Sequence, residues 1–242
     1  MHLPLLHALV EVLFPTCCPA CGRKLLQDEQ VICQDCLDKI PRTEHAAIDN
    51  NGIDMLFAEL IEHEKHVIRY QRGAAFAYYN RMRGRSFRRL IEQGKFGLHP
   101  NPDIFFTLGK EAARDFITSD IFSDIDLLVP VPLHPRRLRE RGFNQAEYIC
   151  QGLSTILHLP VDTEHLIRTR NNPHQSRSKF SKRMKNVEDL FAVQHPEEWK
   201  NKHILLVDDI ITSGATMISC MRTVTPIRGC RVSVFALGWA HS

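Results

Sequence analysis

Two adjacent carboxylates follow an apolar run. The run is residues 203–207, the acids are Asp208 and Asp209, and the turn after them contains Thr212, Ser213, Gly214, Ala215 and Thr216. An apolar run without polar alternation predicts a strand buried on both faces of a parallel sheet, which places the acids at its carboxyl end, where open α/β sheets bind ligands. The N–H groups of the turn and of the next helix favour a phosphate. Carboxylates beside a phosphate cradle predict a ligand that also carries hydroxyls or a divalent metal, such as a sugar phosphate.

A structural role is the alternative for this acid pair. Asp208 and Asp209 would then accept hydrogen bonds from backbone N–H groups in an Asx-type turn after the strand. The complete order of strand, acids, small-residue turn and helix favours the ligand site over this alternative.

Four of the eight cysteines form two Cys-x-x-Cys pairs, Cys18 with Cys21 and Cys33 with Cys36, separated by 11 residues. Two such pairs complete a tetrahedral site for zinc, and because all four positions are thiolates, the metal is predicted to be structural. Cys17 lies one residue too far from Cys21 for this motif, so Cys18 is taken as the ligand. A redox pair is the alternative, but it predicts a single Cys-x-x-Cys motif.

The other cysteines and the first residues indicate the compartment. Cys150, Cys220 and Cys230 fall in apolar patterns and are predicted to be core thiols. Residues 3–14 are apolar but too short for a membrane span and poor as a signal peptide, so a packed amphipathic helix is expected. We therefore expect a cytoplasmic protein with no membrane span, in which metal binding is favoured over disulfides.

Composition and charge limit the class of protein to which the chain can belong. The chain has 242 residues, 43% of them hydrophobic and 24% charged, which is ordinary for a globular protein of one large or two unequal domains. The net charge of +3 is too small to decide by itself what kind of partner the protein binds. Basic residues nevertheless cluster at 81–89, 136–141 and 168–185, which suits a phosphate-rich ligand, although solvated faces are the simpler explanation for any one cluster.

Strand and helix patterns alternate after residue 72. The expected strands are 73–79, 125–131, 159–161, 203–207 and 231–237, and the expected helices are 56–66, 85–92, 107–117, 145–157 with Asn144 as N-cap, and 215–224. The basic segment 168–189 has almost no apolar periodicity and is predicted to be a long loop acting as a lid. The pattern predicts a doubly wound α/β domain over residues 43–242, preceded by a zinc module over 1–42.

Residues 207–216, Val-Asp-Asp-Ile-Ile-Thr-Ser-Gly-Ala-Thr, resemble the phosphoribosyl pyrophosphate (PRPP) signature of type I phosphoribosyltransferases. The resemblance implies that Asp208 and Asp209 hold the ribose hydroxyls and that the turn 212–216 binds the 5-phosphate. Ser213 replaces the usual second Thr and keeps its hydroxyl. The implied fold is a type I phosphoribosyltransferase-like parallel sheet.

Residues 129–146 are similar to a stretch of the ComF family, which is associated with competence and the uptake of transforming DNA. Further matches to the family are Lys95 within 87–96, Arg168-Thr169-Arg170, Gln175, Arg183, Asn186 and Phe191. Family members join a four-cysteine zinc module to a phosphoribosyltransferase-like domain. The resemblance implies PRPP, single-stranded DNA and other competence proteins as partners, and it leaves residues 43–72 without support.

The resemblance also implies roles for the basic segments. The segment 136–141 is expected to be a loop at the pyrophosphate, with Arg141 as its ligand because Gly142 would allow close approach, and with Arg137 and Arg139 in solvent. Arg183 in the lid is predicted to be catalytic together with Asp208 and Asp209, stabilising charge as it leaves C1 of the ribose. Mg²⁺ is implied by the pyrophosphate. No convincing Ser-His-Asp or Cys-His set is found.

Two functions remain open. The first is a ComF-like role in natural transformation, in which the protein handles single-stranded DNA and binds PRPP. The alternative is a Mg²⁺-dependent phosphoribosyltransferase of nucleobase or nucleotide salvage. Single-strand grooves combine cations with stacking aromatics, and the phenylalanines beside the basic clusters are Phe87, Phe96, Phe143 and Phe180, although packing in the core is the commoner role for such residues.

Overall fold

The computed structural model describes residues 15–80, 84–96, 100–118, 122–170 and 190–240. The helix expected within 3–14 and most of the expected lid, including Gln175 and Arg183, lie outside these ranges. The proposals for those residues therefore rest on the sequence alone.

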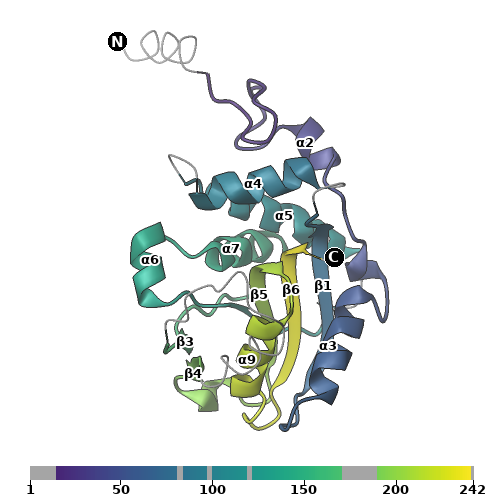
Figure 1. The fold of residues 1–242 in the computed structure, drawn as a ribbon, viewed down its shortest axis with the longest axis vertical. Coiled ribbons are helices and arrows are strands. Elements are labelled where there is room, and N and C mark those ends of the chain that lie inside the picture. Colours follow the sequence, from purple (N-terminus) through teal and green to yellow (C-terminus); the bar gives the residue numbers. More distant parts are fainter. Residues whose placement is uncertain (1–14, 81–83, 97–99, 119–121, 171–189, 241–242) are drawn as a thin grey trace.

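Four parallel strands form the central sheet, in the order β1-β6-β5-β2 (Figure 1). Their bounds are β1 Tyr70–Tyr78, β2 Leu127–Pro130, β5 His203–Ile211 and β6 Arg231–Trp239. The two central strands, β5 and β6, are almost entirely buried, as expected for strands covered on both faces. The parallel α/β class predicted from the apolar runs is confirmed.

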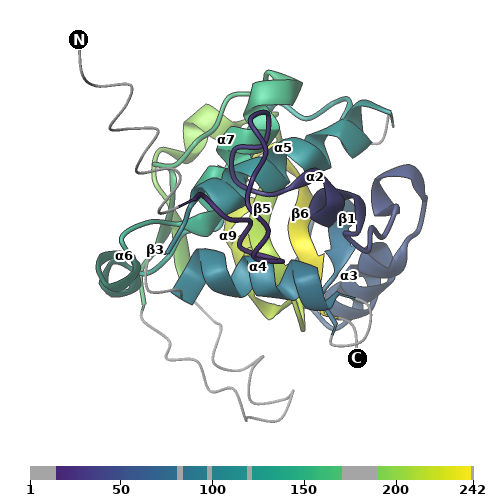
Figure 2. The same ribbon diagram turned by 90° about the horizontal axis from the view of Figure 1, so that it is seen from above.

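Helices cover both faces of this sheet (Figures 1 and 2). One face carries α4 (Arg85–Phe96), α5 (Asp103–Ile117) and α7 (Gln145–Leu157), and the other carries α3 (Gly52–Glu62) and α9 (Ala215–Val224). Successive β5 residues point to opposite faces, so Leu205 and Val207 belong to the first apolar cluster and Ile204 and Leu206 to the second. The doubly wound arrangement predicted from the alternation is confirmed.

Asparagine side chains begin two of these helices. The Asn144 side chain accepts a hydrogen bond from Ala146 N at 3.2 Å, as its predicted N-cap role requires. Asn51 and Asp54 form a capping box at the start of α3, which therefore begins four residues before the predicted stretch 56–66.

Shorter elements connect the layers. They are α2 (Gln34–Asp38), η1 (His45–Ala47), α6 (Pro135–Arg141), η3 (Pro196–Trp199), and the antiparallel pair β3 (Leu166–Arg168) and β4 (Phe191–Val193). The strand expected at 159–161 is reduced to a single bridge between Val161 and Leu128. No helix in the described ranges has the length and apolarity that a membrane crossing needs.

The four-cysteine segment lies at the α4 and α5 end of the molecule (Figures 1 and 2). Its buried apolar residues, including Leu25, Ile32 and Leu37, belong to the same continuous cluster as Leu108 of α5 and Phe235 of β6. The segment is therefore packed onto the sheet domain and shares its core.

Candidate functional site

The acid pair lies inside β5 and not after it, because the strand continues to Ile211. Asp208 pairs in register with Ala236 of β6, but the pairing of β5 with β2 stops at Val207. The β2 side of β5 is therefore open from Asp208 onward, at the carboxyl edge of the sheet. Asp209 N donates a hydrogen bond to Asp208 Oδ1 at 2.8 Å.

Asp208 is only half-buried, but its carboxylate carries an electrostatic cost. Burial and the charge of Asp209 raise the pKa of Asp208 from 3.8 to about 7, against the opposing effects of the Asp209 N–H, Lys95 and Arg168. The free protein therefore holds an acid that a cationic or hydroxyl-bearing ligand would stabilise in its ionised form.

Lys95 of α4 makes an ion pair with the second acid. Its Nζ lies 2.6 Å from Asp209 Oδ2, and both side chains are 15% exposed. The lysine lies in the segment 87–96 singled out by the family resemblance, but its partner was not predicted.

Arg141 stands beside the same acids. Burial lowers the pKa of its guanidinium, while the charges of Asp209 and Asp208 act in the opposite direction. Its guanidinium carbon lies 5.2 Å from the centre of the Phe96 ring. The structure thus brings the predicted pyrophosphate ligand close to the acid pair.

The segment that carries Arg141 is helical, so the expected loop at 136–141 is wrong. Pro135 occupies the first turn of α6, and the His134 side chain accepts a hydrogen bond from Arg136 N. Gly142 ends the helix with φ +86°, and a Cβ there would meet no atom within 4 Å. Gly142 is therefore required for its left-handed backbone, and its expected close approach to the pyrophosphate stays a prediction.

Two further arginines, Arg168 and Arg137, add positive charge to the surroundings of the acid pair. Arg168, expected in the lid, is the last residue of β3, where its guanidinium lies 5.4 Å from the centre of the Phe191 ring. Its Nε is buried and has no hydrogen-bond partner among the described residues. Burial lowers the pKa of Arg168, Arg137 lowers it further, and Asp208 raises it. Arg137 is half-buried, which is less exposed than expected, and its charge also acts on Arg141, whereas Arg139 is exposed as predicted.

The turn after β5 leads into the N-terminus of α9. Gly214 is the N-cap with φ +72°, which favours glycine, and a Cβ there would lie 2.6 Å from Leu60 Cδ1, so a larger residue would have to displace that side chain. No described side chain caps this helix start. Thr212 is exposed, while Ser213, Ala215 and Thr216 are half-buried. The backbone N–H groups at this helix start are suited to a phosphate.

These residues form one site with two acids and a ring of cations. The cations come from three separate segments, α4, α6 and β3, and are Lys95, Arg137, Arg141 and Arg168. An excess of positive charge around two acids suits a ligand that combines a dense anion with a polyol.

The four predicted zinc ligands lie together. The Sγ atoms of Cys18, Cys21, Cys33 and Cys36 are all within 4.8 Å of one another, and those of Cys21 and Cys33 are 3.7 Å apart. A tetrahedral ion with Zn–S bonds of about 2.3 Å separates its sulfurs by about 3.8 Å, so the donor set fits zinc. Although burial opposes it, the N–H groups of Cys33, Cys21 and Ala20 lower the pKa of Cys18 to about 7, which favours the thiolate.

The remaining cysteines agree with their predicted roles. Cys17 is exposed and is not part of this cluster, and Cys150, Cys220 and Cys230 are buried.

The structure does assemble one Ser-His-Asp set, which the sequence analysis missed because its members lie far apart in the chain. His203 Nε2 lies 2.9 Å from Ser233 Oγ, and His203 Nδ1 lies 3.0 Å from Asp124 Oδ1. Ser233 is only 1% exposed, and the set lies at the amino ends of β5 and β6, opposite the acid pair. The hydroxyl is unreachable for a substrate, so the set joins strands and does not catalyse.

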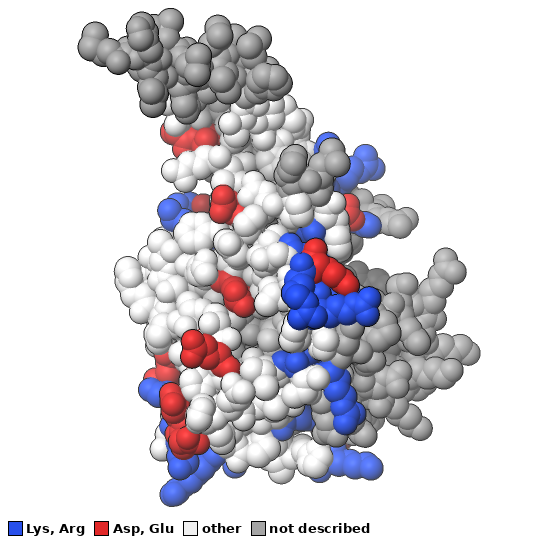
Figure 3. All heavy atoms as spheres, turned by 90° about the vertical axis from the view of Figure 1, so that its left-hand side faces the viewer, with Lys and Arg blue, Asp and Glu red and all other residues white. Residues whose placement is uncertain are grey.

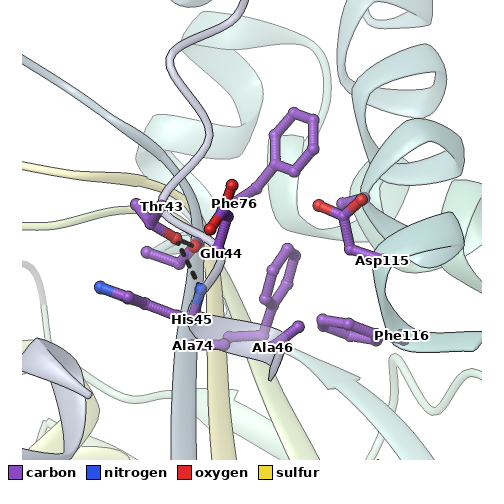
Figure 4. Close-up of a pocket in the computed structure, with 11 residues that line it drawn as sticks. Thr43, Glu44, His45, Ala46, Ala74, Phe76, Asp115 and Phe116 are labelled. Atoms are coloured by element: carbon purple, nitrogen blue, oxygen red, sulfur yellow. Dashed lines mark hydrogen bonds between the residues drawn. The ribbon is translucent and has the colours of Figure 1, made fainter. Parts of the chain in front are cut away.

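A separate cavity between η1, β1 and α5 is too small for a sugar phosphate (Figure 4). Its volume is about 10 Å³, the space of one water molecule. His45 lines it as a neutral imidazole, because burial lowers its pKa to about 4. The acid pair therefore remains the candidate ligand site.

Comparison with known proteins gives relatives that match part of the chain. The "DNA utilization protein YhgH" of Escherichia coli K12 is 34% identical over 112 residues, which cover 46% of this chain and 48% of that protein. The "Competence protein ComFC" of Bacillus subtilis is 38% identical over 91 residues, which cover 38% of this chain and 35% of that protein. The chain thus spans about half or less of the length of the curated relatives it matches.

Among solved structures, the glutamine PRPP amidotransferase of Bacillus subtilis matches 60% of this chain and 30% of its own, with 16% identity and a TM-score of 0.39. No protein-family model matches the chain. The sequence relatives confirm the predicted resemblance to the ComF competence proteins.

Proposed function

As a relative of the ComF competence proteins, this chain is, we propose, a PRPP-binding protein that handles single-stranded DNA during natural transformation. One observation supports the PRPP site. Asp208 and Asp209 meet Lys95, Arg141 and Arg168, and the two acids come directly before a turn and helix start suited to a phosphate. The names of the relatives, which refer to competence and DNA utilization, support the DNA role.

In the proposed complex, Asp208 and Asp209 accept hydrogen bonds from the 2- and 3-hydroxyls of the ribose. The N–H groups of the turn 212–216 hold the 5-phosphate. Lys95 must leave Asp209, to which it is paired in the free protein, and it then becomes available to an anion. Arg183 remains a proposed catalytic residue on the resemblance alone.

The pyrophosphate is assigned to the arginines. Arg141 is half-buried beside the acids, and Arg168 Nε, which has no partner in the part of the chain that the structure describes, leaves a donor for an oxygen ligand. Bound Mg²⁺ would neutralise pyrophosphate oxygens, with the ligand supplying most of its coordination. We therefore expect PRPP and Mg²⁺ to bind together.

Calorimetry tests this assignment. Asp208→Asn combined with Asp209→Asn should abolish binding of PRPP in the presence of Mg²⁺, and Arg141→Ala should weaken it by about tenfold or more, since a charge-assisted hydrogen bond contributes about 1.5–3 kcal/mol. Arg139→Ala on the same helix is the matched control and should bind as the parent protein does, because Arg139 is exposed. Unchanged affinity in the double variant would refute the site.

The DNA role is tested through salt. Lys and Arg side chains gather on the face where α6 lies (Figure 3), and phosphate contacts release counterions, so affinity for an oligonucleotide should fall steeply as salt rises. A flat salt titration would remove this role.

For the N-terminal segment we propose a structural zinc ion on Cys18, Cys21, Cys33 and Cys36, within a module over residues 1–42 that precedes a phosphoribosyltransferase-like domain over 43–242. The tetrahedral spacing of the thiols supports zinc. Four free thiols favour a reducing compartment, so we place the protein in the cytoplasm, where other competence proteins are proposed partners.

The alternative is a Mg²⁺-dependent phosphoribosyltransferase of salvage. The same acid pair and arginines favour it as far as PRPP binding is concerned. Release of pyrophosphate from PRPP on addition of a free nucleobase, without DNA, would support it over the role in transformation.

A further inference from the structure

We propose that Phe96 is a stacking platform for one base of a single-stranded nucleic acid at the entrance of the acid-pair site. The proposal rests on the proposed DNA-handling function and assigns it a residue. Phe96 is the last residue of α4 and is 71% exposed, whereas Phe87, Leu90 and Ile91 of the same helix are fully buried. The helix therefore does not need Phe96 for its packing.

Exposure alone would not identify a site, because single apolar residues are common on protein surfaces. Phe96 is distinguished by its neighbours. The guanidinium of Arg141 lies 5.2 Å from the centre of its ring, and the preceding residue, Lys95, places its Nζ 2.6 Å from Asp209 Oδ2. Arg141 therefore holds the Phe96 ring by a cation–π contact. The residue next to Phe96 in the sequence, Lys95, is paired with one of the two acids proposed to bind the ribose.

The charge around Phe96 selects the kind of partner. Helix α6, which supplies Arg141, has seven residues, four of which are arginines, and it buries none of them. Lys and Arg side chains gather on the face drawn in Figure 3, which is the left-hand side of Figure 1, where α6 lies. An aromatic ring beside a row of cations matches a strand of bases joined by phosphates, since bases stack on aromatic faces and phosphates pair with arginines. An apolar peptide or an apolar face of a second copy would not make use of this charge.

The test compares two fluorescent probes of equal length, oligothymidylate and an oligonucleotide made only of abasic sites, by fluorescence anisotropy. Phe96→Ala should weaken oligothymidylate binding about tenfold, because stacking on an aromatic side chain is worth about 1–3 kcal/mol per base. Its affinity for the abasic probe should equal that of the parent protein. Phe96→Trp should restore or strengthen oligothymidylate binding, and Phe96→Leu should not.

Met55→Ala is the matched control, since Met55 is 68% exposed on α3, on the other face of the sheet. The proposal is overturned if Phe96→Ala binds oligothymidylate as the parent protein does, if it weakens both probes equally, or if Phe96→Leu binds fully. It is also overturned if light scattering shows a dimer that Phe96→Ala dissociates, because the ring would then serve a second copy.

Calorimetry with PRPP and Mg²⁺ separates this proposal from the PRPP site. Phe96→Ala should weaken PRPP binding by at most about fivefold, because it removes the cation–π partner of Arg141 but none of the proposed PRPP ligands. If the parent protein fails to bind PRPP but the oligonucleotide results hold, the PRPP assignment fails and the stacking site stands. If the parent protein binds PRPP but no oligonucleotide, both the DNA role and the stacking site fail.

Discussion

Asp208→Asn should stabilise the free protein while weakening the proposed binding of PRPP. Burial and Asp209 raise the pKa of Asp208 from 3.8 to about 7, so ionisation is cheaper in the unfolded chain than in the folded one. A shift of about three pKa units corresponds to about 4 kcal/mol. Because the side chain is only half-buried and partly screened, we expect a gain of about 2 kcal/mol at pH 8. Asparagine keeps the acceptor for Asp209 N and removes only the charge.

The pH dependence gives the sign of this effect. The cost of the Asp208 charge is absent below about pH 4, grows as the pH rises from 3.8 to about 7, and is then constant. Urea unfolding without Mg²⁺ or PRPP should therefore show a larger gain for Asp208→Asn at pH 8 than at pH 5. An equal gain at both pH values, or no gain at pH 8, would refute the reasoning.

Asp209→Asn is the matched control for this experiment, with the opposite expected sign. Asp209 pairs with the Lys95 ammonium at 2.6 Å, and the lysine is only 15% exposed. Removing the carboxylate breaks that ion pair, which should cost about 1–3 kcal/mol at pH 5, where Asp208 is largely uncharged. At pH 8 part of this cost is offset, because the variant also relieves the repulsion between Asp209 and the ionised Asp208.

Two other predictions concern the metal and the turns. Metal analysis of the purified protein should find about one zinc ion per chain, lost in Cys33→Ser and kept in Cys17→Ser, because only Cys33 belongs to the thiol cluster; retention of zinc in Cys33→Ser would contradict the centre. Gly142→Ala should cost about 1 kcal/mol in urea unfolding, from its left-handed φ alone. Gly214→Ala should cost more, because its Cβ would also clash with Leu60, and equal costs would contradict that contact.

The sequence was sufficient to predict the parallel sheet and the four thiols that lie together. The apolar run 203–207 identified β5, and the Asn144 cap and the periodicity after it identified α7. These predictions succeeded because a buried strand and an amphipathic helix each require a recognisable pattern of apolar residues in the sequence. The same holds for the thiol cluster, since metal geometry requires a fixed ligand spacing.

Helix α6 is an element that apolar periodicity did not predict. It buries no residue, so its sequence carries no apolar periodicity, and the segment was predicted to be a loop. Its termini did carry a signal, because Pro135 at the start and Gly142 at the end are a helix start and stop. Weighing these caps above the missing periodicity would have found the helix.

The partners of the acids could not be predicted, because they depend on how distant segments meet. Lys95 is separated from Asp209 by more than a hundred residues, and Arg168 approaches Asp208 only because the β3–β4 pair folds beside the sheet. Sequence spacing contains no information on such encounters.

The apolar cluster that joins the cysteine segment to the sheet has a consequence for metal loss. Buried residues around the thiols and those of α4, α5 and β6 form one continuous hydrophobic body. A chelator that removes the proposed zinc ion should therefore destabilise more than the four-cysteine segment alone. It should lower the midpoint of thermal melting of the whole molecule, so that supply of the proposed metal would control how long the proposed ligand site survives.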